Sequence, residues 1–242
     1  MNVRGMAGRR AASLTGIPIP RRWILVGMMA AALPGLAFAQ SPVQSALNRD
    51  LRDAALRGDS AVIARLIAAG ADPEARDDRG RTALLIATDG NRIAAARVLM
   101  SAGADVNAQD DVLDSPYLLA GARGYVEILR LALDNGADVR SLNRFGGTAL
   151  IPACERGHVE AVRILIAAGV DVDHVNNLGW TGLLEAVILG DGGPAHGEVV
   201  RLLIVAKADV NLADRDGVTP LAHARKRGQR EIEALLRAAG GR

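Results

Sequence analysis

The sequence predicts an all-α fold, a solenoid of about six 33-residue helix-turn-helix-hairpin repeats. Two independent markers recur along the chain with the same spacing. A Gly-Ala-Asp tripeptide or a variant of it closes each copy, with aspartates at Asp72, Asp105, Asp138, Asp171 and Asp209. A threonine or serine opens a helix in the next copy, at Thr82, Ser115, Thr148, Thr181 and Thr219. Both markers are spaced by 33 residues, and both lengthen to 38 at the last interval. Agreement at one fixed period indicates stacked repeats.

Residues 1–39 predict a secretory signal that precedes the solenoid. Two arginines are followed by a 17-residue apolar run, residues 23–39, which ends in Ala-Phe-Ala. Basic residues, an apolar segment and a small-residue site are typical of a cleavable signal peptide. We expect cleavage between Ala39 and Gln40 and no membrane association afterwards. A retained anchor is the alternative, and the general and twin-arginine export routes both remain open.

The charge balance changes once the leader is set aside. The leader holds five arginines and no acidic residue, which leaves 24 of the 29 basic side chains against 27 acidic ones. Residues 40–242 therefore carry a net charge of −3. The basic surface typical of nucleic-acid binders is missing, so no nucleic-acid partner is expected. Cys154 is the only cysteine, so no intramolecular disulfide can form.

Each copy is predicted as two helices and a hairpin. In the copy that begins near residue 144, Thr148 is expected to cap a short helix and Gly157 to reverse the chain. Residues 159–169 form a second amphipathic helix, which Gly169 ends in a left-handed turn. The first copy has no threonine cap and is expected to form the N-terminal cap of the stack. The copies lie at about 45–78, 79–110, 111–143, 144–176, 177–214 and 215–242, which we call copies one to six.

The five extra residues fall in copy five. Aligning Glu198 with Glu160 and Glu127 of the earlier copies places an insertion loop in the turn between the two helices. Lengthening a surface turn in this way costs only about half a kcal/mol. Its glycines join two helices and its proline lacks an N–H donor, so a phosphate-binding loop is not expected. The insertion consists of Asp191, Gly192, Gly193, Pro194 and Ala195.

The helix starts resemble those of ankyrin repeats. TALLIA, SPYLLA, TALIPA, TGLLEA and TPLAHA are near-matches to the T-P-L-H-x-A pattern, and the copies end in G-A-D-V-N or variants of it. The resemblance implies a non-catalytic scaffold that binds a protein partner, with no cofactor and no small-molecule substrate. The leader and copies four and five also resemble exported bacterial ankyrin-repeat proteins, which implies a periplasmic or secreted location.

Some exported proteins of that kind are linked to periplasmic catalase and to protection against oxidative stress. This resemblance implies an alternative function, an accessory or chaperone-like factor that supports a periplasmic redox enzyme such as catalase. The sequence leaves the identity of the partner open.

The resemblance also implies where a partner binds, at the hairpin tips and at the ends of the first helices of the copies. Copy five has an unusual number of apolar residues at these positions, as expected of a binding hot spot. The alternative, which stays open, is that part of this apolar set packs under the enlarged loop. The predicted contact residues are Phe145, Leu178, Trp180, Ile188 and Leu189, with Arg123, Arg156 and Arg227 around them.

No catalytic or metal site is predicted. Cys154 and His158 are four residues apart, but Cys154 takes the place of a small buried residue. Asp171, Asp173 and His174 include two possible ligand types, yet aspartate recurs at each hairpin for turn geometry. His158 and His196 share a position at which imidazole is expected to hydrogen-bond neighbouring loop backbone.

Two residues depart from the repeat pattern. Pro152 lies inside the first helix of copy four, where it is expected to remove a backbone hydrogen bond or to kink the helix next to Phe145. Leu113 replaces the turn glycine of copy three, which predicts a weak point in that hairpin.

Overall fold

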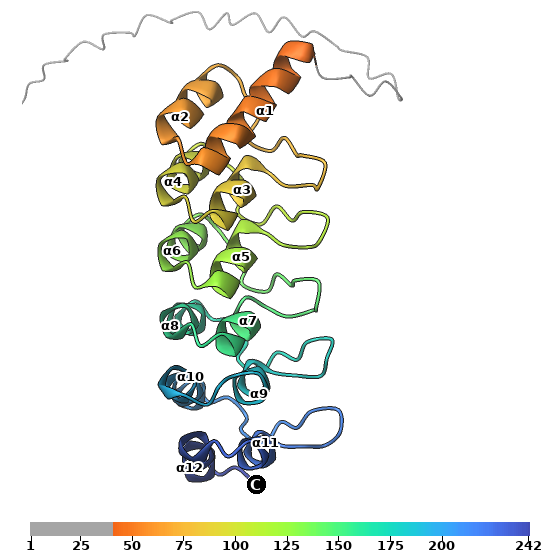
Figure 1. Cartoon of the computed structure of the whole chain (residues 1–242), viewed down its shortest axis with the longest axis vertical. Helices are drawn as coiled ribbons and strands as arrows, with labels where there is room; N and C mark the ends of the chain where they lie inside the picture. Colours follow the sequence, from red (N-terminus) through yellow and green to blue (C-terminus); the bar gives the residue numbers. More distant parts are fainter. Residues whose placement is uncertain (1–40) are drawn as a thin grey trace, which may run out of the picture. The chain divides into compact units, whose positions relative to one another are not determined.

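A computed structural model describes residues 41–242 (Figure 1). The predicted signal peptide and its cleavage site between Ala39 and Gln40 lie outside the described residues. Within residues 41–242, none of the helices combines the length and apolarity needed to span a bilayer.

Twelve helices within residues 41–242 form six consecutive pairs, and no strand is present among them. Figure 1 shows the pairs stacked in chain order, with hairpin loops projecting beyond the odd-numbered helices. Each odd-numbered helix packs on the next odd-numbered one, and each even-numbered helix on the next even-numbered one. The all-α solenoid is confirmed. The pairs are α1 (Pro42–Arg57) and α2 (Ser60–Ala68), α3 (Ala83–Asp89) and α4 (Ile93–Ser101), α5 (Pro116–Arg123) and α6 (Val126–Asp134), α7 (Leu150–Glu155) and α8 (Val159–Ala167), α9 (Gly182–Ile188) and α10 (Pro194–Val205), α11 (Pro220–Lys226) and α12 (Arg230–Ala238).

Side-chain caps explain where most first helices begin. Thr82 and Thr181 each accept a hydrogen bond from the backbone N–H three residues later, as do Ser115 and Thr219. Such a cap satisfies a helix N–H that has no partner within the helix. In the first copy Ser41 takes this role, because its hydroxyl accepts from the Gln44 N–H at 3.2 Å. Helix α1 therefore begins at Pro42 and runs for 16 residues.

The predicted cap at Thr148 is wrong. Helix α7 begins only at Leu150, has six residues and lacks a side-chain cap. The Thr148 hydroxyl is buried without a hydrogen-bond partner. The physical reason is Pro152, which has no N–H to donate to the Thr148 carbonyl. Ile151 donates to that carbonyl instead, at 3.3 Å, which tightens the first turn and removes the cap geometry.

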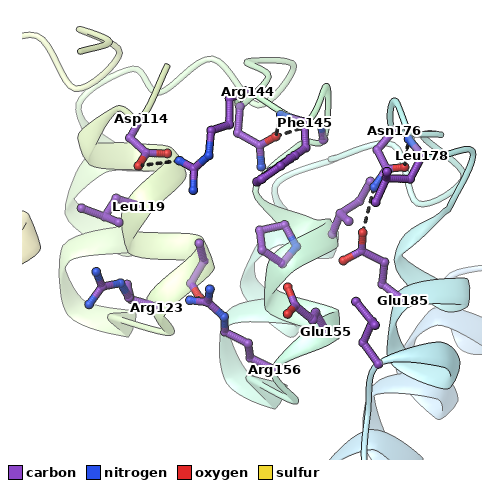
Figure 2. Close-up of a pocket in the computed structure, with 16 residues that line it drawn as sticks. Asp114, Leu119, Arg123, Arg144, Phe145, Glu155, Arg156, Asn176, Leu178 and Glu185 are labelled. Atoms are coloured by element: carbon purple, nitrogen blue, oxygen red, sulfur yellow. Dashed lines mark hydrogen bonds and ion pairs between the residues drawn. The ribbon is translucent and has the colours of Figure 1, made fainter. Parts of the chain in front are cut away.

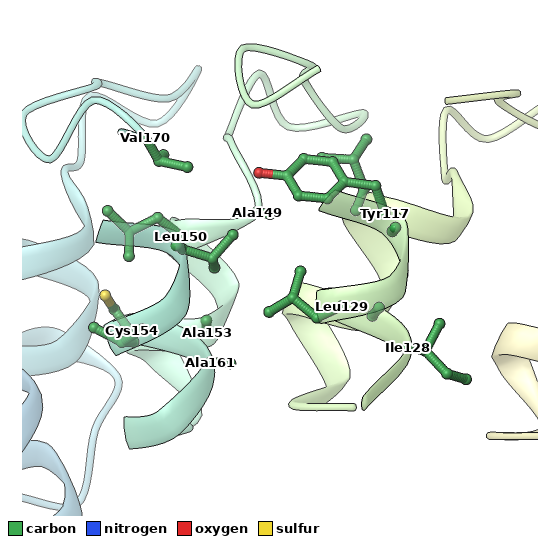
Figure 3. Close-up of a cluster of buried hydrophobic side chains, with 14 of the residues drawn as sticks. Tyr117, Ile128, Leu129, Ala149, Leu150, Ala153, Cys154, Ala161 and Val170 are labelled. Carbon is green, nitrogen blue, oxygen red and sulfur yellow. The ribbon is translucent and has the colours of Figure 1, made fainter. Parts of the chain in front are cut away.

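The core consists of two columns of apolar side chains, one from each helix row. The first column has Leu84, Tyr117, Leu150, Leu183 and Leu221, and the second has Leu99, Ala132, Leu165, Leu203 and Leu236. All ten are almost completely buried, and Figure 3 shows Tyr117 and Leu150 within a cluster of buried side chains. Burying one such aliphatic side chain contributes about 1.5–3 kcal/mol. No pair can bury its column alone, so the stack is stabilised by its neighbour contacts.

The five hairpin tips that precede α3, α5, α7, α9 and α11 are each held by a turn of the same geometry. An aspartate or asparagine five residues before the capping position accepts hydrogen bonds from two backbone N–H groups of the turn. In most copies a glycine provides the left-handed residue of this turn. Leu113 takes that conformation in copy three, with φ of 61°. The turn fixes which tip residues face outward.

The insertion of copy five is part loop and part helix. Pro194 and Ala195 form the first turn of α10, which has 12 residues where the other second helices have nine. The prediction that all five residues lie in the turn is therefore wrong for these two. Proline is favourable at the first position of a helix, where its missing N–H has no partner to lose. Asp191 accepts from the Gly193 N–H at 2.8 Å and orders the remaining loop.

His196 connects this loop to the preceding repeat. One ring nitrogen lies 2.8 Å from Asp191 Oδ1, and the other lies 2.9 Å from the Glu155 carbonyl oxygen. His196 therefore contacts neighbouring backbone, as expected, but at the last residue of α7 and not in a loop. The contact attaches the enlarged turn to the end of α7.

Candidate functional site

A cavity of about 340 Å³ lies between the first helices and the hairpins of copies three to five (Figure 2). Its base is formed by α5, α7 and α9, and its outer wall by the hairpins that precede α7 and α9. We call this cavity the groove. It brings together side chains that are more than 60 residues apart in sequence, from Asp114 to Leu189.

Large apolar side chains are exposed around the groove. Phe145 is 51% exposed, and Leu178 and Leu189 are each 49% exposed. Val112, at 50%, occupies the same hairpin position as Phe145 and Leu178, one copy earlier. We call Val112, Phe145 and Leu178 the hairpin stripe. Exposed apolar side chains aligned on consecutive repeats lower the free energy of a complex when a partner covers them.

The groove includes five of the eight predicted contact residues. Phe145, Leu178, Leu189, Arg123 and Arg156 line it. The other three, Trp180, Ile188 and Arg227, do not, so the predicted apolar patch is not continuous.

These three residues have other surroundings. Trp180 corresponds in register to Gly147, which lines the groove one copy earlier, but Trp180 itself does not line it. Trp180 and Ile188 are half-buried. Arg227 donates a hydrogen bond to the Gly190 carbonyl at 3.1 Å, which ties it to the repeat junction after α9.

The arginines of the groove are held by contacts within the chain. Arg144 pairs with Asp114 at 3.3 Å, and its guanidinium lies 4.8 Å from the centre of the Phe145 ring. Arg123 pairs with Asp89 at 3.2 Å. Arg156 donates to the Ala122 carbonyl at 2.9 Å. These contacts orient the cationic side of the groove before any partner binds.

The groove also contains Glu185, which the sequence-based prediction missed. Glu185 is only 6% exposed, and Asn176 Nδ2 donates a hydrogen bond to its carboxylate at 2.8 Å. Burial, followed by the nearby charge of Glu155, raises the pKa of Glu185 to about 7. The repeat register contains the signal that could have found it. The corresponding residues in copies two, three, four and six are Ile86, Leu119, Pro152 and His223, and none of these four is acidic.

Other reactive groups have structural surroundings. Cys154 is fully buried, and burial raises the pKa of its thiol. Asp171 accepts from the Asp173 N–H, and His174 lies 2.7 Å from the Gly146 carbonyl oxygen, so both take part in hairpin geometry. In the part of the chain that the structure describes, no three His, Cys, Asp or Glu residues are placed to hold a metal ion.

Comparison with known families and structures agrees with this architecture. Ankyrin repeats (3 copies) match residues 117–214, and a single ankyrin repeat matches residues 79–111. An ankyrin repeat domain from Acinetobacter baumannii, known at 1.00 Å resolution, is 58% identical with a TM-score of 0.78. The alignment covers 80% of this chain and 98% of that domain.

Two further solved structures are similar. The ankyrin repeat protein EF0377 is 38% identical with a TM-score of 0.74, over 77% of this chain and 96% of that one. The ankyrin repeat domain of Bcl-3, a member of the IkappaB family, is 27% identical with a TM-score of 0.71, over 79% and 86%. No curated protein matches the chain. The family matches, the identity to solved ankyrin domains and the stacked helix pairs together show that the chain belongs to the ankyrin-repeat family.

Proposed function

We propose that this protein is a non-catalytic scaffold that binds a partner protein through the groove and the hairpin stripe. Ankyrin repeats generally mediate protein–protein interaction. The observation that carries the proposal is the alignment of Val112, Phe145 and Leu178 on three consecutive hairpins beside a cavity. The stripe ends where Arg79 and Asp216 take the same position in the flanking copies.

The energetics favour Phe145 as the central anchor. Its ring is half exposed, and Arg144 holds it from one side. An aromatic residue that fills a well-packed pocket at the centre of an interface is typically a hot spot. Replacing such a residue with alanine costs on the order of 2 kcal/mol of binding free energy or more. The arginines already have partners within the chain, so ordering them on binding costs little side-chain entropy.

Site-specific crosslinking tests the proposal. A photoreactive phenylalanine analogue replaces Phe145 in one form of the protein and Val205, an exposed apolar residue of α10, in the control form. We expect a discrete crosslinked protein with the analogue at position 145 and none with it at position 205. Equal crosslinking at both positions would show that the contacts are unspecific, and the proposal would then fail.

We also propose that the protein acts in the periplasm or is secreted, which residues 1–39 support as a predicted signal peptide. Fractionation of cells that express the full chain, followed by N-terminal sequencing, tests this. A protein that begins at Gln40 in the periplasmic fraction is expected. The full chain in the cytoplasm would contradict it.

The narrower role, an accessory factor for a periplasmic redox enzyme such as catalase, is supported only by the resemblance of the leader and of copies four and five to exported proteins. It predicts that the crosslinked partner is a catalase or peroxidase, and that its activity falls in cells that lack this protein. A partner of any other class would leave the scaffold role standing and remove the accessory role.

A further inference from the structure

The two charged sides of the groove differ in how their charges are balanced. On one side, Arg123 and Arg144 have carboxylate partners, Asp89 and Asp114. On the other side lie Glu155 and Glu185, and neither forms an ion pair with any residue that the structure describes. Figure 2 shows both glutamates on the α7 and α9 side of the groove, opposite Arg123.

The elements around Glu185 supply no positive charge to it. The groups that shift its pKa are the burial itself, Glu155 on α7 and the Asn176 amide, and no arginine is among them. Cys154 on α7 is buried and neutral. Among the titratable groups of the other helices packed against α9, His196 of α10 faces Asp191, His223 of α11 faces Asp214, and Arg225 of α11 pairs with Glu233.

We propose that the glutamate side of the groove binds a lysine or arginine side chain of the partner protein. Its charged end would lie at Glu155 and Glu185, and its aliphatic stem against Phe145 and Leu189. This inference deepens the proposed function and rests on it.

The shape and lining of the groove favour a long basic side chain over a free metal ion. Lysine and arginine bury an apolar stem while their charged end keeps polar contacts, which matches apolar walls that lead to buried carboxylates. A calcium ion prefers about six to eight oxygen ligands, and only two carboxylates meet here. The volume of about 340 Å³ accommodates a side chain together with part of its backbone.

Binding of this cation is expected to depend on pH. Only the ionised form of Glu185 attracts it, and the pKa of about 7 leaves that form scarce below neutral pH. The lysine or arginine stays charged throughout, because its own pKa is about 10 or higher. The apparent affinity scales with the competent fraction, so it should rise about tenfold from about pH 6 to about pH 8.

The experiment uses the full chain and a phage-displayed library of random short peptides, selected at about pH 8 with Phe145→Ala protein as the counter-selection. We expect selected peptides that share a lysine or arginine flanked by apolar residues. One selected sequence is then synthesised as two peptides. The first keeps its basic residue, and the second has norleucine at that position, which keeps the aliphatic side chain and removes the charge. Fluorescence anisotropy measures both dissociation constants.

Three outcomes support the inference together. The norleucine peptide should bind at least about tenfold more weakly, as expected when one member of a charge pair is removed. Glu185→Gln should weaken the basic peptide similarly and abolish the pH dependence. Glu127→Gln, which removes an exposed carboxylate of α6, should change neither. Glutamine at 185 can still accept from Asn176, and circular dichroism confirms that each variant is folded.

Two results would overturn the inference, and they separate it from the proposed function. If groove-dependent peptides lack a basic residue, or bind Glu185→Gln unchanged, the cation site is wrong and the protein-binding role stands. If no selected peptide depends on Phe145, both the cation site and the groove as a partner site are wrong.

Discussion

Two equivalent pairs of residues, one beside α9 and one beside α11, occupy the same positions in their repeats but differ in chemistry. Asn176 and Glu185 occupy the same repeat positions as Asp214 and His223. In the later pair a ring nitrogen of His223 lies 2.7 Å from the Asp214 carboxylate, so each group has a partner within the chain. In the earlier pair Asn176 donates one hydrogen bond to Glu185 but supplies no charge.

The pKa directions follow from this difference. The backbone N–H of Val218, with help from His223, lowers the pKa of Asp214. Burial raises the pKa of Glu185 to about 7. A complete internal pair stabilises its own repeat, whereas an incomplete one leaves a charge that an external group can neutralise. This difference is the reason for proposing α9, and not α11, as the place where a basic group of a partner binds.

Truncating the buried leucine that precedes Glu185 or His223 is expected to give the largest change in stability. Leu183 and Leu221 precede Glu185 and His223 by two residues, and both are almost fully buried. Leu183→Ala should lower the free energy of unfolding by about 2–5 kcal/mol, and Leu221→Ala by less, because α11 lies in the last pair of the stack. Urea denaturation measures both. Equal losses would mean that the end pair is as tightly packed as the interior.

The charge of Glu185 should act in the opposite direction. Its pKa is raised in the folded state, so folding loses stability as the pH rises from about 4.5 to about 7. Glu185→Gln should therefore stabilise the protein by about 1–2 kcal/mol at about pH 8, allowing for solvent in the groove, and by almost nothing near pH 4. Chemical denaturation at both pH values decides. A gain that is independent of pH would contradict the raised pKa.

Converting one pair into the other tests the comparison directly. The double variant Asn176→Asp with Glu185→His gives copy five the residues of the Asp214–His223 pair. Its free energy of unfolding near pH 8 should be about 1 kcal/mol higher than that of the parent, because the new Asp and His would hydrogen-bond to each other. It should also lose the basic peptide. Retained peptide binding would show that the charge of Glu185 is not what the groove offers.

A smaller effect is expected at the hairpin tips. Leu113 adopts φ of 61°, a conformation that glycine takes at the same position before α7, so Leu113→Gly should stabilise by about half a kcal/mol. The matched control is Gly146→Ala, whose added Cβ would lie 2.5 Å from Asn177 Oδ1, and which should destabilise by more than that. Thermal unfolding compares the two. A loss of stability in Leu113→Gly would mean that the leucine contributes packing that outweighs its backbone strain.

Prediction from sequence succeeded for most of the helix caps, where the regular repeat pattern is kept. The caps at Thr82, Ser115 and Thr181 depend on residues within one turn, and the period locates them. It failed at Thr148, where the proline four residues later removes the hydrogen bond on which the regular helix start depends. It also failed for Pro194 and Ala195, because a proline that suits the first turn of a helix resembles a loop residue in a glycine-rich segment.

By itself, the sequence determined the family, the number and order of the helix pairs, and the row of hairpin-tip positions that contains Phe145 and Leu178. It could do so because a solenoid is stabilised by contacts between neighbouring copies, so one period describes the whole stack. Only the tertiary structure decided which side chains share the groove, that Trp180 lies outside it, and that Glu185 is buried near Glu155 with no ion-pair partner among residues 41–242. Those properties depend on distances between residues of three successive copies and on exclusion of water from the space between them. The order of residues along the chain contains neither quantity.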